Sequence, residues 1–285
     1  MRLTFVWGFF PTLVLFLSAP FVGHAQVVTP TITPTPGAEG LHTQVSDPTA
    51  VGGHTQYEIT GGTRPGGGSI LFHSFGDFNV PPNTTANFLN NGSFDLNGTP
   101  LGDGLATSNI LARVTNPNPS SIFGTIQTNG DGGFGSANFF LMNPSGILFG
   151  PDASLNVGGS VSFTTAQYIR LFDGLNSANF YANPANDDLA NSVLAMAPVG
   201  DFGFLPAAYG FLDSSPAAIS IQGSTLTVQP FQSISLVGGN HGFPYTDPNT
   251  GASASVPGGV MITGGGLSAR HRAERFQADQ DQGRA

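Results

Sequence analysis

The chain contains no cysteine and no lysine, and only 9% of its residues are charged. Without cysteine there is no disulfide framework, so stability has to come from burial and from backbone hydrogen bonds. All eight basic residues are arginine, and four of them lie within residues 270–285. Binding to nucleic acid requires a basic stripe that neutralises phosphates, and the body of the chain offers none. Nucleic acid is therefore not an expected partner.

Long apolar runs are also missing beyond the N-terminus. The run Phe5–Phe21 follows Arg2 and precedes small residues at positions 23 and 25, which is the pattern of a secretory signal peptide. We expect residues 1–25 to be this signal, with cleavage after Ala25. The run is marginal in length for a membrane span and no charged stop-transfer flank follows it. No stable transmembrane segment is therefore predicted.

Glycine, proline and phenylalanine are abundant, with 40, 22 and 24 copies, and the hydrophobic content is 39%. A disordered chain carries far fewer apolar residues, so this one is expected to build a core. Frequent turn residues between short apolar runs are typical of proteins made of many short strands. Composition therefore predicts an all-β fold.

Residues 137–166 show this pattern most clearly, because four apolar runs follow one another with turns of two to four residues between them. Proline fixes φ and glycine permits positive φ, so the breaks are turns with a physical cause. The runs are too short for helices and predict strands that wind round a core. They are Asn138–Met142, Gly146–Phe149, Ser154–Val157 and Ser160–Thr164.

The rest of the chain divides by composition. Residues 26–38 alternate proline and threonine and form either a polyproline-like linker or an extended entry strand; a mobile leader is favoured. Residues 39–269 form the folded body. Within it, residues 173–218 are less regular and predict an excursion from the main body. Residues 270–285 are charged and without strand pattern, which indicates a disordered tail.

Three blocks in the body together resemble a known family. They occupy residues 59–80 (ITGGTRPGGGSILFHSFGDFNV begins at 59), 110–130 and 139–166, and their order and spacing resemble those of the filamentous haemagglutinin N-terminal domain. This is the secretion domain of two-partner secretion exoproteins, and the version common in large cyanobacterial exoproteins is also similar. The resemblance covers about residues 38–269.

The resemblance implies a single-stranded, right-handed parallel β-helix with an N-terminal cap and extra-helical strands. With roughly 20–25 residues per coil, the body is expected to make about ten coils. The implied role is secretion across a Gram-negative-type envelope: periplasmic domains of an outer-membrane β-barrel transporter recognise the chain, which folds at the cell surface. An adhesin with a host or surface glycan or protein as ligand is the implied kind of exoprotein.

The family's Asn-Pro-Asn-Gly-type motif also has a counterpart here, with serine in place of the second asparagine. By resemblance it is a secretion and folding motif, although a simple β-helix corner is an equally open interpretation. Its positions are Asn143, Pro144, Ser145, Gly146 and Ile147. A second turn, expected to flank the motif, consists of Asn116, Pro117, Asn118 and Pro119.

Signals for catalysis are weak. There is no Gly-x-Ser-x-Gly elbow and no histidine pair at metal-ligand spacing. Asp187 and Asp188 are adjacent, so their side chains diverge on a strand or a helix. The loop Gly61–Gly68 lacks the Lys-Ser/Thr ending of a phosphate loop. We therefore predict no enzyme, cofactor or metal site. A secreted β-helix that binds or cleaves carbohydrate, or a truncated gene product without its own activity, stays open as an alternative.

Overall fold

The computed structural model describes most of the predicted body. The predicted signal peptide, its cleavage residue Ala25 and the tail at residues 270–285 lie outside the described part. The described residues are 32–102, 104–203 and 217–238, with the strands at 243–246, 253–256 and 260–263.

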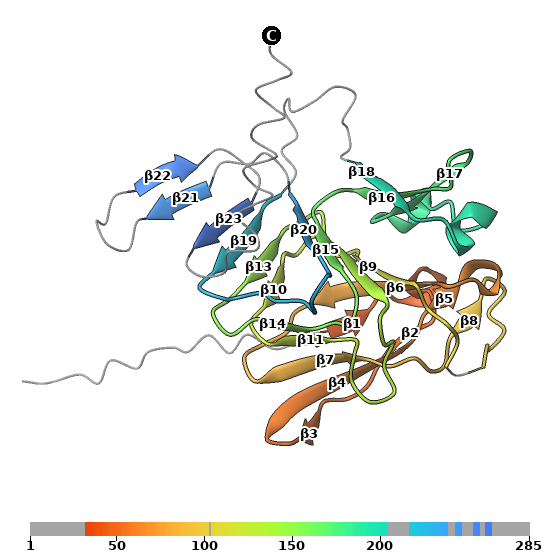
Figure 1. The fold of residues 1–285 in the computed structure, drawn as a ribbon, viewed down its shortest axis with the longest axis horizontal. Coiled ribbons are helices and arrows are strands. Elements are labelled where there is room, and N and C mark those ends of the chain that lie inside the picture. The colour runs from red at the N-terminus through yellow and green to blue at the C-terminus, as the bar shows by residue number, and fades with distance from the viewer. Residues whose placement is uncertain are drawn as a thin grey trace, which may run out of the picture.

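Three sheets of parallel strands form the body, and the chain visits them in a fixed order (Figure 1). Sheet 1 contains β4 (His54–Gly61), β7 (Thr84–Phe88), β11 (Thr125–Gln127) and β14 (Ser154–Asn156). Sheet 2 contains β6 (Ile70–Phe78), β9 (Asn109–Val114), β12 (Asn138–Met142), β15 (Val161–Thr164) and β20 (Ile234–Val237). Sheet 3 contains β10 (Ser120–Ile122), β13 (Ile147–Phe149), β19 (Ile219–Gln222) and β23 (Val260–Thr263).

Three successive circuits pass through sheets 1, 2 and 3, and each raises the chain by one level; they are β7–β9–β10, β11–β12–β13 and β14–β15–β19. The fold is therefore the expected parallel β-helix. The four runs predicted in residues 137–166 are confirmed as β12 to β15. The expectation of about ten coils is wrong, because sheet 2 places only five strands in parallel succession within the described residues. The coils use more residues than expected, for two reasons. One ordinary coil already separates the paired residues Asn109 and Asn138 by 29 positions. The insertion after β15 separates Ser160 and Gln232, on adjacent levels, by 72 positions.

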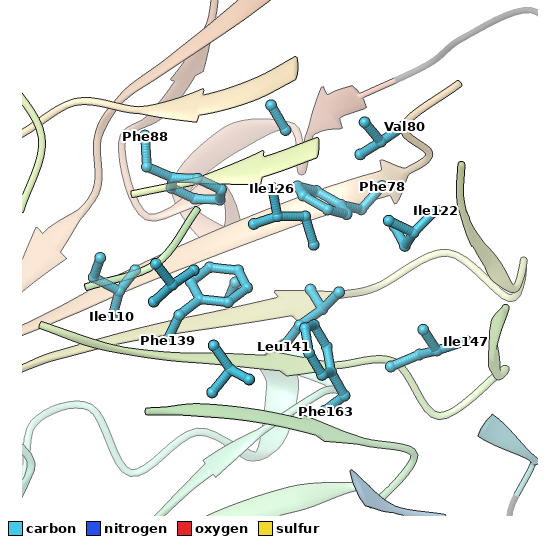
Figure 2. Close-up of a cluster of buried hydrophobic side chains, with 14 of the residues drawn as sticks. Phe78, Val80, Phe88, Ile110, Ile122, Ile126, Phe139, Leu141, Ile147 and Phe163 are labelled. Atoms are coloured by element: carbon cyan, nitrogen blue, oxygen red, sulfur yellow. The ribbon is translucent and has the colours of Figure 1, made fainter. Parts of the chain in front are cut away.

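The bore of the helix is filled by alternate residues of all three sheets. Figure 2 shows Phe88, Phe139 and Phe163 among side chains that converge from different levels. Phe88 and Phe139 meet edge to face with ring centroids 5.1 Å apart, and Phe149 meets Phe163 in the same way at 4.8 Å. These geometries suit aromatic quadrupoles. Inward apolar residues at every level thus make one continuous core.

The N-terminal end of the helix is closed by a cap built largely from antiparallel strands. The first of them, β1, pairs with β6 and buries Ile32, so for these residues the structure has the extended strand and not a mobile leader. Covering an open sheet end in this way satisfies edge groups. The cap elements are β1 (Ile32–Pro34), η1 (Gly37–Gly40), β2 (Thr43–Val45), β3 (Thr49–Val51), β5 (Thr63–Arg64), η2 (Pro65–Gly67) and β8 (Phe94–Asp95).

An extra-helical sheet leaves the helix between β15 and β19. Its strands β16 (Tyr168–Phe172), β17 (Ser177–Tyr181) and β18 (Val199–Gly203) are antiparallel, with 3-10 turns η3 (Pro184–Asn186) and η4 (Ser192–Ala195) after β17. A hairpin of β21 (Phe243–Thr246) and β22 (Ser253–Val256) lies between β20 and β23. Figure 1 shows these two additions at opposite ends of the view.

The extra-helical sheet covers the outer face of sheet 2 with a second apolar cluster. Ile70, Phe72 and Leu111 of sheet 2 pack there with Ile169 and Phe180. Sheet 2 is therefore covered on both faces, and residues of β6 and β9 are buried at nearly every position rather than at alternate ones.

Candidate functional site: an asparagine corner between sheets 2 and 3

Asn143, the first residue of the turn that joins β12 to β13, accepts two hydrogen bonds from later residues of the same turn. Oδ1 of Asn143 accepts the N–H of Ser145 at 2.9 Å, and the main-chain oxygen of Asn143 accepts the N–H of Gly146 at 3.1 Å. Pro144 supplies the fixed φ that the second turn position requires. Gly146 has φ +118°, a conformation that side chains rarely adopt. The local sequence therefore specifies this turn.

The side chain of Asn143 is fully buried and binds the level below. Its Nδ2 donates to the main-chain oxygen of Asn118 and to Oγ of Ser120, both at 2.9 Å. Its main-chain N–H donates upward to the oxygen of Thr164, also at 2.9 Å. One residue thus connects three successive levels of the helix. We call residues 143–147, with these partners, the asparagine corner.

The second predicted turn, Asn116–Pro119, lies one level below the corner and is exposed. Nδ2 of Asn116 donates to Oδ2 of Asp77 at 2.8 Å, and Nδ2 of Asn118 donates to Oδ1 of the same carboxylate at 2.9 Å. Asp77 belongs to β6, one level lower again. A charged acceptor that takes one amide on each oxygen holds both asparagines in place.

Backbone hydrogen bonds connect the corner to the levels below and above it. The main-chain oxygen of Gly146 accepts the N–H of Ser120 at 2.9 Å, and the N–H of Ile147 donates to the oxygen of Ala218 at 3.1 Å. A Cβ atom on Gly146 would lie 3.3 Å from that oxygen of Ala218. Ile147 itself begins β13 with its side chain in the bore. The corner is thus packed against both neighbouring levels.

The two turns that the sequence indicates separately are therefore stacked and bonded to each other. Serine in place of asparagine at position 145 is accommodated, because the corner uses the main-chain N–H of that residue. Asp77, Ser120 and Thr164 are partners that sequence reasoning missed. The sequence held one indication for Asp77: like Asn143, it lies near the end of a strand, shortly before proline.

A second buried polar group, Arg113, connects three parts of the fold. Its guanidinium forms an ion pair with Asp187, 74 residues away, and lies 5.0 Å from the ring centroid of Phe180. Nε donates to Oγ of Ser74 at 2.8 Å, and NH2 donates to the main-chain oxygen of Glu39 in the cap at 3.1 Å. Cap, sheet 2 and extra-helical sheet meet at this one side chain.

Desolvation on burial outweighs the mutual attraction of Arg113 and Asp187 in its effect on both pKa values. Burial raises the pKa of Asp187, although the charge of Arg113 opposes that rise. Burial likewise lowers the pKa of Arg113 against the attraction of Asp187. A buried pair of this kind adds little net stability, but it strongly penalises the loss of one partner. Asp187 is thus an ion-pair partner and not half of an acid–base pair with Asp188.

Within the described residues, no three histidine, aspartate or glutamate side chains gather in a way that could hold a metal ion. No described helix is long and apolar enough to cross a membrane.

Comparison with known proteins identifies the family of this chain. The TPS secretion domain family, TPS standing for two-partner secretion, matches residues 38–281. The chain belongs to this family. Among solved structures, the filamentous hemagglutinin secretion domain matches the TPS domain with 18% sequence identity and a TM-score of 0.40, covering 82% of this chain and 70% of that one. No curated protein sequence matches.

Family membership gives the TPS domain a role in transport. It is a two-partner secretion substrate, whose partner is an outer-membrane transporter and whose destination is the cell surface or the extracellular space. The resemblance drawn from three sequence blocks is thereby confirmed at the level of the family. Secretion, and not catalysis, defines this family.

Replacing Asn143 with alanine should destabilise the folded TPS domain by about 2–4 kcal/mol, because Ser120 and Asn118 lose a buried donor. Ser145→Ala is the matched control and should change stability by less than about 0.5 kcal/mol, since it keeps the main-chain bond. Urea denaturation of both variants measures the difference. Equal stability of the two variants would contradict the role assigned to the buried amide.

For the ion pair of Arg113 and Asp187, we expect the loss of one partner to destabilise the fold more than the loss of both. Asp187→Leu should cost about 3–5 kcal/mol, because it leaves Arg113 charged and buried without its partner. The double variant Arg113→Met with Asp187→Leu should recover most of that loss, since no charge then stays in the second core. Thermal or urea unfolding of the two variants provides the test. A double variant less stable than the single one would show that Arg113 is needed mainly for its other hydrogen bonds.

Proposed function

We propose that the asparagine corner, Asn143–Ile147, together with the turn Asn116–Pro119 below it, is the secretion and folding motif of this TPS domain. The observation that carries the proposal is the complete burial of Asn143 between two neighbouring levels. A side chain in that position cannot be contacted by another protein once the helix has formed. Its two roles therefore belong to two different states of the chain.

In the unfolded chain the motif is a recognition segment. Asn116, Asn118 and Asn143 each precede a proline, and a residue before proline is held away from the helical region. Such segments are extended with little conformational freedom, and extended segments are suited to pairing with the edge strand of a receptor. The periplasmic domains of the transporter are the proposed receptor.

In the folded chain the same residues hold one level on the next. A solenoid gains its stability from contacts between neighbouring levels. When Asn143 closes on Asn118 and Ser120, β13 is aligned on β10 and the strands that follow have a template. Folding on the outer surface thus buries Asn143, so the folded chain no longer presents that side chain to the transporter, which makes transport directional.

Separate measurements of export and refolding test this proposal. Cells that produce the transporter and full-length Asn143→Ala should release much less protein than cells with the unchanged chain. Purified Asn143→Ala should also refold more slowly after dilution from urea. Ser145→Ala is the control for both assays. Unchanged export with impaired refolding would reject the recognition role and leave the folding role intact.

We further propose that the secreted protein is an adhesin-like exoprotein of a cell with a Gram-negative-type envelope, and that it binds a host or surface glycan or protein. Its support is membership of the TPS family, whose domain delivers a chain to the cell surface. A glycan and cell-binding screen with the purified mature chain should show binding without shortening of the glycan. Depolymerisation of a polysaccharide would favour the carbohydrate-cleaving alternative instead.

A further inference from the structure

His73 lies where the cap meets the first level of the helix. It belongs to β6, between Leu71 and Phe75, whose side chains both enter the bore. None of its surface is exposed. Its ring centroid is 6.0 Å from that of Phe75 and 5.5 Å from that of Phe88, which it meets edge to face. An ionisable ring thus occupies a position that apolar residues fill at other levels.

The hydrogen bonds around His73 suit the neutral ring only. Nδ1 lies 3.3 Å from Oγ1 of Thr43, on the cap strand β2, and that hydroxyl also accepts the N–H of Ser74 at 3.0 Å. Nε2 is buried and has no hydrogen-bond partner among the described residues. A protonated ring donates from both nitrogens, so it would bury a charged N–H without an acceptor.

A neighbouring positive charge makes protonation of His73 still less favourable. Arg64, on the cap strand β5, is fully buried. Its guanidinium donates to neutral groups on Gly68, Asn90 and Thr107, and no carboxylate in the described part of the chain forms an ion pair with it. The strands packed around His73 also carry Asp77, on β6, which binds Asn116 and Asn118, and Arg113, on β9, which pairs with Asp187. Arg64 is the charged group that acts on the His73 ring. Burial, and then Arg64, lower the pKa of His73 from 6.5 to about 3.

We propose that protonation of His73 releases the cap from the helix, so that the N-terminal end of this TPS domain opens in acid. The imidazolium gains water as an acceptor if β2, which carries Thr43, separates from β6, and it moves away from Arg64 if the cap strand β5 separates from β6 as well. The proton comes from solvent and no other group has to react. The device is a property of the folded domain and does not depend on the secretion role of the asparagine corner.

The direction of the pH dependence follows from the difference between the pKa of His73 in the closed state and in the open state. In the closed state the pKa of His73 is about 3, whereas the pKa of a free histidine is 6.5. The stabilisation of the closed state is complete above pH 6.5 and declines as the pH falls toward 3. The opening equilibrium should therefore rise about tenfold per pH unit below 6.5, or roughly a hundredfold by pH 4.5.

Hydrogen exchange on the intact mature chain, between pH 7.5 and 4.5 and corrected for intrinsic rates, tests this. Amides of the cap strand Thr43–Val45 should lose protection roughly a hundredfold by pH 4.5, while amides of β12 keep theirs. His73→Met fills the same space without a titrating group and should abolish this response. His54→Gln, at an exposed position, should leave it unchanged.

Three results would overturn the proposal. They are cap protection that does not depend on pH, an acid response retained in His73→Met, and an acid response lost in His54→Gln. Nitrogen NMR of the His73 ring in the unchanged chain provides a measurement that does not depend on how any variant folds. A neutral ring in every molecule with a closed cap is the expected result, and an imidazolium signal with a closed cap contradicts it.

Discussion

Hydrogen bonds between successive levels set the conditions for the rest of this structure. Parallel strands pair only when the chain returns in register after every circuit, and a shift of one residue would turn the apolar side chains outward. Chain length does not provide that register, since Thr125 and Ser154 on adjacent levels are 29 residues apart whereas Asn138 and Ser160 are 22 apart. Corner contacts have to provide it, and Asn143 does so by bonding directly to the level below.

Three buried polar groups in this TPS domain lie where different parts of the fold meet. Asn143 lies between levels, Arg113 lies between the helix and the extra-helical sheet, and His73 lies between the helix and the cap. Each is surrounded by apolar packing that tolerates several arrangements, whereas a polar group is satisfied in only one. We infer that these three side chains determine which surfaces meet, while the phenylalanine-rich bore supplies most of the stability.

Much of this was readable from the sequence. Short apolar runs with proline and glycine between them identified β12 to β15 almost to the residue, because both strand period and turn chemistry are local. The two asparagine turns were found for the same reason. Their stacking was not, and neither was the pairing of Arg113 with Asp187, because contacts across 74 positions leave no local pattern. The number of levels was overestimated because the excursion after β15 consumes chain without adding to the bore.

The corner between sheets 2 and 3 changes its character along the helix. At the levels of β9 and β12 it is a tight turn, but after β15 the extra-helical sheet leaves from the same corner, and after β20 the hairpin of β21 and β22 does so again. The bore is unaffected, because a corner contributes little to it. This edge of the solenoid is thus a natural point for gaining or losing sequence during evolution. It is also where a foreign peptide could be grafted for display with the least disturbance to the scaffold.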